Sequence, residues 1–286
     1  MPEPETGLVC TERTPRVVTA RKLLRRAGRE RAGRFLAEGS QAVDAALAAA
    51  GDGGGRVYEL FATAEALGHH PGLERTARDL GVPVTLVTER AAAALSETVT
   101  PQGLIAVCGL LHVSVETALA GTPTLVVMLV EAADPGNVGA LIRVADAAGA
   151  DAVILAGDGC DPHNGKSVRA SAGSVFHLPL APVRDVPSAL TECRRRGLRL
   201  LAATAGGELD LDTAAEDGTL AAPSAWLFGN EAHGLPGDVT GAADHRVSVP
   251  IHGRAESLNL ATAAAVCVYA SARAQRRERG RGGALS

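Results

Sequence analysis

The chain has 286 residues, of which 46% are hydrophobic and 21% charged, so it can bury a core and is not a disordered protein. Only 2% are aromatic, which argues against the aromatic base-stacking platform of many single-strand binders. The net charge of −4 excludes a uniformly basic protein. No apolar run approaches the roughly 18 residues of a membrane span, and no apolar stretch follows Glu3 and Glu5 as it would in a signal peptide.

The cysteines and histidines do not form recognisable metal or disulfide patterns. The five cysteines are isolated, with no Cys-x-x-Cys pair, which is typical of a reducing compartment. The eight histidines lack the spacing of metal ligands. Gly51–Gly55 has no strand before it and is expected to be a loop, not a nucleotide-binding turn. We therefore expect a cytoplasmic protein with no bound metal and no membrane association.

Charge is distributed unevenly along the chain. Residues 13–34, which we call the basic segment, hold nine basic residues and one acidic residue, Glu30. Residues 273–281 hold five Arg and one Glu. Such separation suggests an electrostatic surface for a polyanion. A solvated basic helix with a frayed basic tail would explain the pattern equally well.

The first part of the chain is expected to form an α/β domain over residues 13–111, preceded by a disordered leader at 1–12. A helical pattern of apolar residues extends from Val17 to Ala50. Short strands then alternate with helices. The strands are expected at 57–62, 82–87 and 104–110, and the helices at 74–80 and 91–96. A linker is expected at 112–123.

Residues 124–275 are expected to form a parallel α/β domain, followed by a basic flexible tail at 276–286. The apolar run Thr124–Glu131 is typical of a central parallel strand. A helix is expected from the turn at 134–137 to about Ala148, with Gly149 at its C-cap. Later strands are expected at 152–156, 198–203, 224–228 and 247–250, and an Ala-rich helix at 258–275. A doubly wound sheet of this kind carries its site at the carboxyl ends of its strands.

Three motifs follow strands of this second domain. The first runs from Asn137 to Arg143 and begins at a helix start, where the Asn137 side chain can cap free N–H groups. The second contains Gly229 and Glu231, and its glycines would let the backbone approach a ligand beside one carboxylate. Taken singly, the first also fits a plain helix cap with a surface arginine, and the second a glycine-rich turn.

The third motif runs from Pro250 to Leu260 and feeds the last helix, whose first turn is expected to present Ser257 and Asn259. Alone, it also fits a capping box without the acidic residue. No single motif of the three identifies a function.

Together the three motifs resemble the signatures NxGxxxR, GxE and PxxGxxxSLN of the SpoU/TrmH family of RNA ribose 2′-O-methyltransferases. They occur in that order within about 125 residues. The segment Lys166–Pro179 is also similar to that family. Phe35–Gly39 and Pro101–Leu104 resemble its N-terminal substrate-binding domain, a ribosomal-protein-like α/β module. The resemblance covers residues of roughly 15 to 275.

The resemblance implies a fold and a cofactor. Members of the family tie the C-terminal parallel sheet into a deep trefoil knot of the SPOUT type, an exception to the rule against threaded connections. The knot binds S-adenosylmethionine, and the site is completed across a homodimer interface. Carried over to this sequence, the contacts to the cofactor fall on Thr204, Gly229, Val249, Ile251 and Leu258. No metal is needed.

The chemistry implied by the resemblance requires activation of a hydroxyl group. A ribose 2′-hydroxyl is a poor nucleophile and must lose its proton as it attacks the sulfonium methyl group in line. The resemblance assigns this activation to Arg143, although arginine in proteins keeps its proton. Either Arg143 loses its proton in the site, or it positions the RNA phosphate and hydroxyl while another group accepts the proton. Glu231 could orient Arg143, and Asn137, Ser257 and Asn259 could position the hydroxyl and ribose.

The sequence therefore predicts methylation of a ribose 2′-hydroxyl in RNA. Ribosomal RNA is the expected substrate, because a separate substrate-binding domain precedes the catalytic one. The alternatives are a tRNA methyltransferase, a methyltransferase with another substrate, and a non-catalytic RNA-binding module on the same fold. The side chains expected to contact RNA are Arg21, Lys22, Arg25, Arg26 and Arg169. A homodimer is expected through the helix at 258–275, because that helix is apolar on more than one side.

Overall fold

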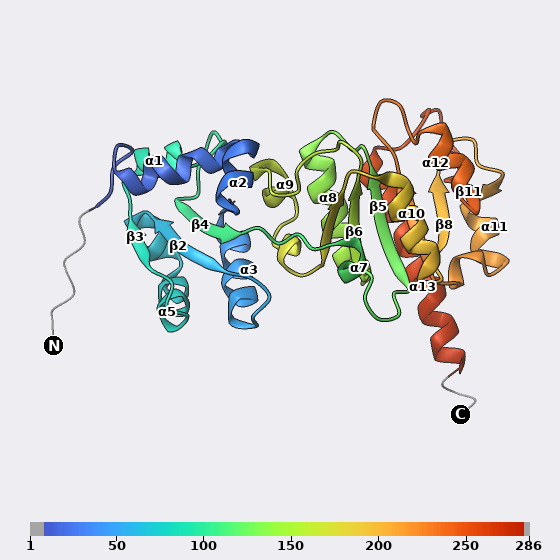
Figure 1. The fold of residues 1–286 in the computed structure, drawn as a ribbon, viewed down its shortest axis with the longest axis horizontal. Helices are drawn as coiled ribbons and strands as arrows, with labels where there is room; N and C mark the ends of the chain where they lie inside the picture. The colour runs from blue at the N-terminus through green and yellow to red at the C-terminus, as the bar shows by residue number, and fades with distance from the viewer. Residues whose placement is uncertain (1–8, 283–286) are drawn as a thin grey trace. The chain divides into compact units, whose positions relative to one another are not determined.

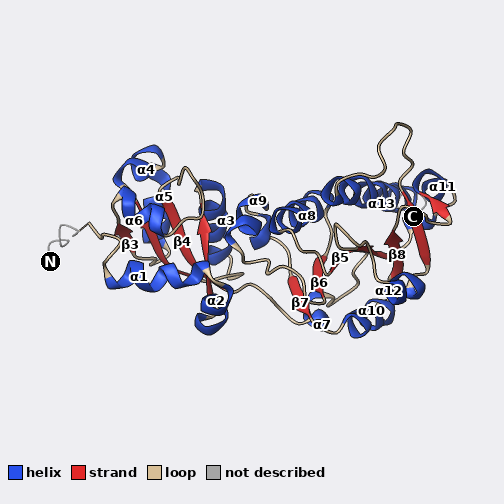
Figure 2. Cartoon of the chain, turned by 90° about the horizontal axis from the view of Figure 1, so that it is seen from above, coloured by secondary structure: helices blue, strands red, loops and turns tan. Residues whose placement is uncertain are grey.

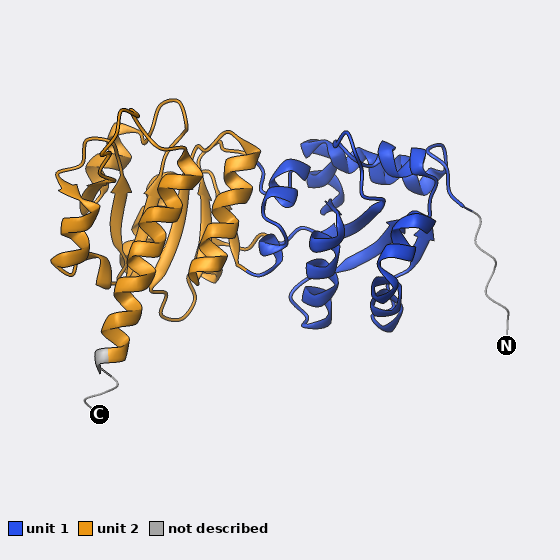
Figure 3. Ribbon diagram, turned by 180° about the vertical axis from the view of Figure 1, so that it is seen from behind, with its two compact units in different colours: residues 1–111, 161–177 blue, residues 112–160, 178–286 orange. Residues whose placement is uncertain are grey.

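The structure is a computed structural model that describes residues 9–282, with side chains described up to residue 280. These residues form two compact units (Figure 3). Unit 1 consists of residues up to 111 together with 161–177, and unit 2 of residues 112–160 and those from 178 onwards. In the described part of the chain, no helix combines the length and apolar character needed to cross a membrane. None of the five cysteines, which all lie among the described residues, forms a disulfide bond.

Unit 1 is a four-stranded mixed sheet with helices around it (Figure 1). Its strands have the order β1-β4-β2-β3, in which β4 is antiparallel to β1 and β2, while β3 is parallel to β2. The strands are β1 (Arg34–Glu38), β2 (Val57–Ala62), β3 (Val84–Leu86) and β4 (Leu104–Gly109). The helices are α1 (Pro15–Arg21), η1 (Lys22–Leu24), α2 (Arg26–Ala32), α3 (Ser40–Gly51), α4 (Ala64–His69), α5 (Pro71–Asp79), α6 (Glu89–Ala94), α9 (Gly165–Ala170) and η2 (Ser174–Phe176).

The expected continuous helical pattern from Val17 to Ala50 is wrong, because β1 lies in its middle. Gly33 takes a left-handed conformation with φ of 62° and ends α2, and Gly39 with φ of 93° precedes α3. Phe35 and the three residues after it are all buried. A strand covered on both faces carries consecutive apolar residues, and such a run cannot be told from a buried helix by periodicity.

Three expected boundary segments are more ordered than the sequence indicated. Residues 1–8 of the expected leader lie outside the described residues, but the N–H of Cys10 donates to the carbonyl of Leu86 at 2.8 Å. The expected linker contains α7 (Val115–Ala118), which packs into the core of unit 2. The expected tail continues the last helix, α13 (Leu260–Gly282), as far as the structure describes it. Apolar burial holds the expected linker, a backbone hydrogen bond holds Cys10, and side-chain hydrogen bonds from Arg276 and Arg279 hold the start of the expected tail.

Unit 2 is built around a seven-stranded parallel sheet with the order β7-β6-β5-β10-β8-β11-β9. This confirms the predicted parallel α/β architecture. The strands are β5 (Leu125–Val130), β6 (Ala152–Ala156), β7 (Leu180–Val183), β8 (Arg199–Ala203), β9 (Leu209–Asp210), β10 (Ser224–Phe228) and β11 (His245–Ser248). The other helices are α8 (Pro135–Ala148), α10 (Val186–Arg195), α11 (Leu211–Glu216), η3 (Thr219–Ala221) and α12 (Gly237–Ala242).

Helices cover both faces of this sheet (Figure 2). The helices α7, α10 and α12 pack on one face, and α8 and α13 on the other. Every residue of the neighbouring strands β5 and β10 is buried. The buried indole of Trp226 donates from Nε1 to the Ser271 hydroxyl at 2.9 Å, which ties α13 to the sheet. Arg276 donates to the carbonyl of Ala148 at 2.7 Å and so satisfies the C-terminal end of α8.

Candidate active site

A cavity of about 510 Å³ lies in unit 2 beside the ends of β8, β10 and β11, within the size range of small-molecule sites. Its wall contains residues of all three sequence motifs. Of the ten residues expected to be catalytic or to bind cofactor, nine line it and Arg143 does not. The nine are Asn137, Thr204, Gly229, Glu231, Val249, Ile251, Ser257, Leu258 and Asn259.

The polar side of the cavity is a chain of hydrogen bonds that joins the three motifs. Asn137 donates from Nδ2 to Oε1 of Glu231 at 3.0 Å. The other end of the same amide, Oδ1, accepts from Nδ2 of Asn259 at 3.2 Å. Because one amide both donates and accepts, its orientation is determined by its two partners. Residues separated by up to 122 positions in the sequence are thereby held in one arrangement.

The helix caps differ from the expected ones. Asp134, not Asn137, caps α8, and its carboxylate accepts from the N–H of Asn137 at 2.9 Å. Asn259 caps α13, with Oδ1 accepting from the N–H of Ala261 at 2.9 Å. Ser257 therefore lies in the loop before α13 and not in its first turn. With Asp134 as the cap, the Asn137 side chain is available for the polar chain.

Glu231 is held as a carboxylate. Burial raises its pKa, but hydrogen bonds from the Asn137 amide and from the N–H groups of Ala133 and Asp134 outweigh burial and lower the pKa below its ordinary value. Those three donors occupy both carboxylate oxygens. No hydrogen bond or ion pair joins Glu231 to Arg143 in this structure, so the orientation of Arg143 by Glu231 stays a prediction.

Gly229 has a stricter steric requirement than the motif alone indicated. A Cβ atom at this position would lie 2.2 Å from the carbonyl carbon of Gly234. The close approach is to the chain's own backbone, because Asn230 and Gly234 exchange backbone hydrogen bonds at 3.0 and 2.8 Å and fold the loop back. Glycine at position 229 is thus required by the loop that carries Glu231.

The other side of the cavity is apolar apart from one hydroxyl. Val249 and Leu258 are half-buried, and Ile251 is 38% exposed. The Oγ1 atom of Thr204 is buried and has no hydrogen-bond partner in the described part of the chain. A buried hydroxyl without a partner is costly, so a ligand group that pairs with it would gain affinity.

Arg143 stands apart from the polar chain. It lies in the middle of α8, is exposed, and makes no ion pair or hydrogen bond with any described residue. Six residues along an α-helix correspond to a rotation of about 240° from Asn137. That rotation explains why the two ends of one motif do not face the same cavity.

Two residues near this cavity were missed by the sequence analysis. Asn230 donates from Nδ2 to the carbonyl of Glu131 at 2.9 Å and accepts from the N–H of Ala232 at the same distance. Glu131 has φ of 54°, which is unusual for a residue other than glycine. Glu131 directly follows β5, and this position at a strand end was the only sign of it in the sequence. Its unusual backbone conformation is of the kind that gathers at functional sites.

In unit 1, the basic residues expected to contact RNA fall into two classes. Arg21, Lys22 and Arg25 are exposed and form no ion pair among the described residues. Arg26 pairs with Glu30 at 2.9 Å. Arg169 pairs at 3.0 Å with Glu38, whose side chain is buried, so its guanidinium is already used within unit 1.

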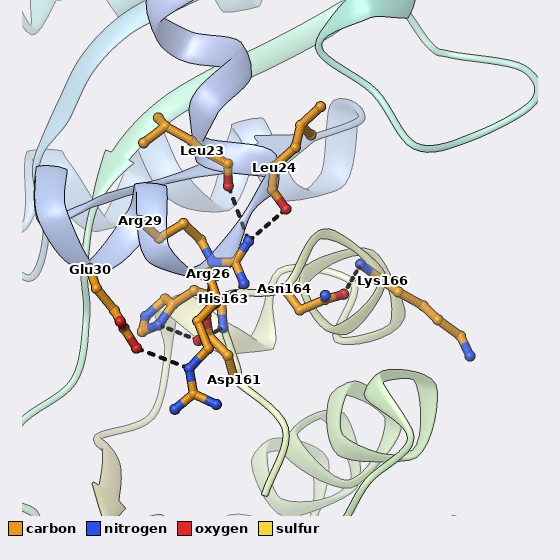
Figure 4. Close-up of polar contacts among 9 residues, drawn as sticks. All are labelled: Leu23, Leu24, Arg26, Arg29, Glu30, Asp161, His163, Asn164 and Lys166. Atoms are coloured by element: carbon orange, nitrogen blue, oxygen red, sulfur yellow. Dashed lines mark hydrogen bonds and ion pairs between the residues drawn. The ribbon is translucent and has the colours of Figure 1, made fainter.

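Arg29 has a structural role that its place in the basic segment did not indicate. It is 3% exposed and pairs with Asp161 at 2.8 Å (Figure 4). It also donates to the carbonyls of Leu23 and Leu24, both at 3.0 Å. Burial raises the pKa of Asp161, but hydrogen bonds from His163 and the charge of Arg29 lower it far below its ordinary value. This buried pair fastens residues 161–177 to unit 1.

Comparison with known proteins finds two family models that match successive parts of the chain. Residues 124–269 match the model of the SpoU rRNA Methylase family, and residues 14–106 match that of the MRM3-like substrate binding domain. The chain is 34% identical over 251 residues to the 23S rRNA (guanosine(2553)-2′-O)-methyltransferase RlmP of Bacillus subtilis, covering 87% of this chain and 92% of that one.

Solved structures are similar over nearly the whole chain. The AdoMet-bound rRNA methyltransferase from Sinorhizobium meliloti superimposes with a TM-score of 0.79 at 28% identity, covering 94% of this chain and 97% of that one. The SpoU methyltransferase AviRb from Streptomyces viridochromogenes, in complex with AdoMet, gives 0.76 at 29% identity, covering 93% and 100%. Both of these structures contain the methyl donor.

Proposed function

Since this chain belongs to the SpoU rRNA methylase family, we propose that it transfers the methyl group of S-adenosylmethionine to a ribose 2′-hydroxyl of ribosomal RNA. The observation that carries the proposal is the meeting of all three motifs at one cavity, where Glu231, Asn137 and Asn259 form a continuous polar chain. The substrate is taken from the names of the relatives and from the match to a substrate-binding domain.

The cavity fits S-adenosylmethionine. Val249, Ile251 and Leu258 offer aliphatic surfaces to an adenine ring, and the unpartnered hydroxyl of Thr204 offers one hydrogen bond. The backbone of Gly229 lines the same cavity. When bound, S-adenosylmethionine supplies an electrophilic methyl group on a sulfonium sulfur. No metal is needed for this proposal.

The polar chain would orient the methyl acceptor. Asn137 and Asn259 hold each other in place, and the hydroxyl of Ser257 lines the same cavity without a hydrogen bond to any described residue. These groups suit a ribose hydroxyl, which both donates and accepts. Glu231 acts as a positioning residue through Asn137. Its lowered pKa keeps it ionised at neutral pH, and its oxygens are occupied, so it is a poor candidate to accept the proton.

Arg143 would act from the RNA side. Its exposed guanidinium has no acidic partner among the described residues and can bind a phosphate through two parallel hydrogen bonds. We therefore favour a role in positioning the RNA phosphate and the hydroxyl. Activation of the hydroxyl by a deprotonated Arg143 is the alternative.

We also propose a trefoil knot, a homodimer and a cytoplasmic location. The insertion of β10 between β5 and β8 supports a threaded C-terminal region. On α13, Val266 is 40% and Tyr269 is 46% exposed, and these residues lie three positions apart on one helix face. A partner copy covering this face would explain its apolar character. The five cysteines, all within the described residues, form no disulfide bond, which is compatible with a reducing cytoplasm.

The proposed activity is tested with purified protein and methyl-labelled S-adenosylmethionine. Unmodified ribosomal RNA and bulk tRNA are supplied in parallel, and the label incorporated into each is counted. We expect label in ribosomal RNA only. Label in tRNA alone would show that the substrate is tRNA and not ribosomal RNA. Cofactor binding without transfer to either RNA would favour a non-catalytic module. Asn259→Ala should reduce transfer strongly, while Asn164→Ala, the same change at a helix cap of unit 1, should not.

A further inference from the structure

Unit 1 contains a second concave surface, and no residue of the three sequence motifs lines it. A groove of about 880 Å³ is bordered by α1, η1 and α2 and reaches β1, β2 and β4. Most of its wall is apolar, with Val18, Leu23, Ala27 and Val107 among the lining residues. Val18 is 44% exposed although it is a β-branched apolar residue. An apolar groove rimmed by polar side chains is the kind of surface that marks an interaction site.

The edge of the groove is cationic. It carries Arg21, Lys22, Arg25, Arg31 and Arg34. None of these five forms an ion pair in the described part of the chain. The one acidic lining residue, Glu59, already pairs with Arg16 at 3.2 Å and accepts a hydrogen bond from Thr85 at 2.6 Å. The groove therefore presents several uncompensated positive charges around an apolar floor.

One end of the groove adjoins a flat aromatic surface. The guanidinium carbon of Arg34 lies 3.7 Å from the ring centroid of Tyr58, and that of Arg56 lies 4.6 Å from it. Both arginines are accessible at least in part. Guanidinium planes stacked on an aromatic ring offer a flat surface on which an unpaired nucleobase can stack. This surface is made by one tyrosine and two arginines, so low aromatic content does not exclude it.

We infer that this groove binds a single-stranded segment of RNA, with phosphates on the cationic edge and base or ribose faces on the apolar floor. The inference rests on the proposed function for the identity of the polyanion. A duplex presents its phosphates and sugars outward and keeps its base faces stacked inside. Its phosphates can bind the cationic edge, but its bases cannot contact the apolar floor or stack on the Arg34–Tyr58 surface. A single strand can make all three contacts, because its bases are unpaired and accessible.

The charge part of the inference is tested with full-length protein and a fluorescently labelled, unstructured RNA of 12 nucleotides. Binding is measured by fluorescence anisotropy at several salt concentrations. The variant R21Q/K22Q/R25Q should bind more weakly, and the slope of log affinity against log salt should fall by about 0.7 for each lost phosphate contact, about 2 in all. The control R75Q/R78Q/R90Q removes the same charge from exposed residues of α5 and α6 and should keep the wild-type slope.

The floor is tested by Val18→Ser and Tyr58→Leu. Each should weaken binding of the single strand about fivefold or more, the range for a lost base contact, and leave the salt slope unchanged. The same 12 nucleotides annealed as a duplex should bind more weakly than the single strand and should respond to neither substitution. Equal losses in the groove variant and its control, or equal affinity for duplex and single strand, would overturn the inference.

The methyl-transfer assay separates this inference from the proposed function. If the groove variants lose RNA binding while the wild-type protein lacks methyltransferase activity, the groove stands and the proposed function fails. If transfer to ribosomal RNA is intact in R21Q/K22Q/R25Q at limiting RNA concentration, the proposed function stands and the groove is not its RNA site.

Discussion

The cavity of unit 2 and the groove of unit 1 both carry polar side chains beside apolar ones, but these polar side chains are partnered in opposite ways. At the cavity, Glu231, Asn137 and Asn259 are joined by hydrogen bonds to one another. Along the groove, Arg21, Lys22 and Arg25 form no ion pair among the described residues. Partnered groups are held in one position, which chemistry requires. Unpartnered cations attract a polyanion at long range without fixing its position.

Each unit contains an arginine that departs from this pattern. Arg29 is a buried, fully partnered arginine inside the basic segment. Arg143 is an unpartnered arginine in the unit that holds the partnered cavity. Substitution of Arg29 and of Arg143 tests the comparison most strongly. Loss of the partnered Arg29 should affect stability, and loss of the unpartnered Arg143 should affect the interaction with RNA.

The largest effect is expected from Arg29→Met. Arg29 is buried and the Asp161 side chain is 15% exposed. Removal of Arg29 therefore leaves a largely buried carboxylate with hydrogen bonds from His163 but without its ion pair to Arg29, which costs up to about 3–5 kcal/mol. The free energy of unfolding of unit 1, measured by urea denaturation, should fall by that amount. Arg26→Met is the matched control, because its exposed pair with Glu30 is worth only about 0–1 kcal/mol. Equal losses of unfolding free energy in the two variants would show that the Arg29–Asp161 pair contributes no more to stability than an exposed pair.

Arg143→Ala should lower kcat/KM for methyl transfer by about 100-fold or more, as removal of a transition-state contact does. Arg143→Lys should fail as well, because an ammonium group cannot reproduce the planar fork of the guanidinium. The affinity for S-adenosylmethionine, measured by calorimetry, should stay the same, since Arg143 does not line the cavity. Arg195→Ala on α10 is the control. A variant at position 143 that keeps most of its rate would remove Arg143 from the site.

The buried pair also predicts how stability depends on pH. The pKa of Asp161 is lowered in the folded state, so its contribution is fully present above its unfolded pKa of about 3.9. As pH falls below that value, the contribution should be lost. Asp161→Asn should therefore flatten the acid limb of the stability profile, and Asp44→Asn, an exposed position in the same unit, should leave it unchanged.

A smaller effect is expected at the start of α8, where Asp134 caps the helix and Asn137 belongs to the polar chain. Asp134→Ala should lower the free energy of unfolding of unit 2 by about 1 kcal/mol, as loss of an N-cap does. Asn137→Ala removes no cap and should cost less stability. It should nevertheless reduce methyl transfer, because Glu231 loses one of its three donors and Asn259 loses the acceptor of its amide N–H. The opposite ranking of the two variants in stability would contradict the assignment of the cap.

The sequence predicted the members of the site better than their contacts. Asn137, Glu231 and Asn259 were all expected there, because each lies after a strand of a parallel sheet and those strand ends meet at one edge. Their mutual hydrogen bonds could not be predicted, because register and helix rotation decide which amide reaches which carboxylate. For the same reason the Glu231–Arg143 contact was expected and is not formed.

The fold was predictable where the hydrophobic pattern was strong and local. The buried strands β5, β6 and β10 were found within a residue or two of their ends. By contrast, β1 was taken for helix, because burial on both faces removes its alternation. Residues 161–177 are joined to unit 1 by contacts such as Arg29–Asp161 and Arg169–Glu38, whose partners lie more than 130 positions apart in the sequence. Local patterns contain no information about such a pairing.

The central claim is tested most directly by identifying the atom that receives the methyl group. Full-length protein is incubated with unmodified 23S ribosomal RNA and S-adenosylmethionine carrying a heavy methyl group, and the RNA is digested to nucleosides for mass spectrometry. We predict a labelled 2′-O-methylated nucleoside, formed by the wild-type protein and lost in Arg143→Ala. A label on a nucleobase, or a 2′-O-methyl label that Arg143→Ala leaves undiminished, would contradict the proposed active site.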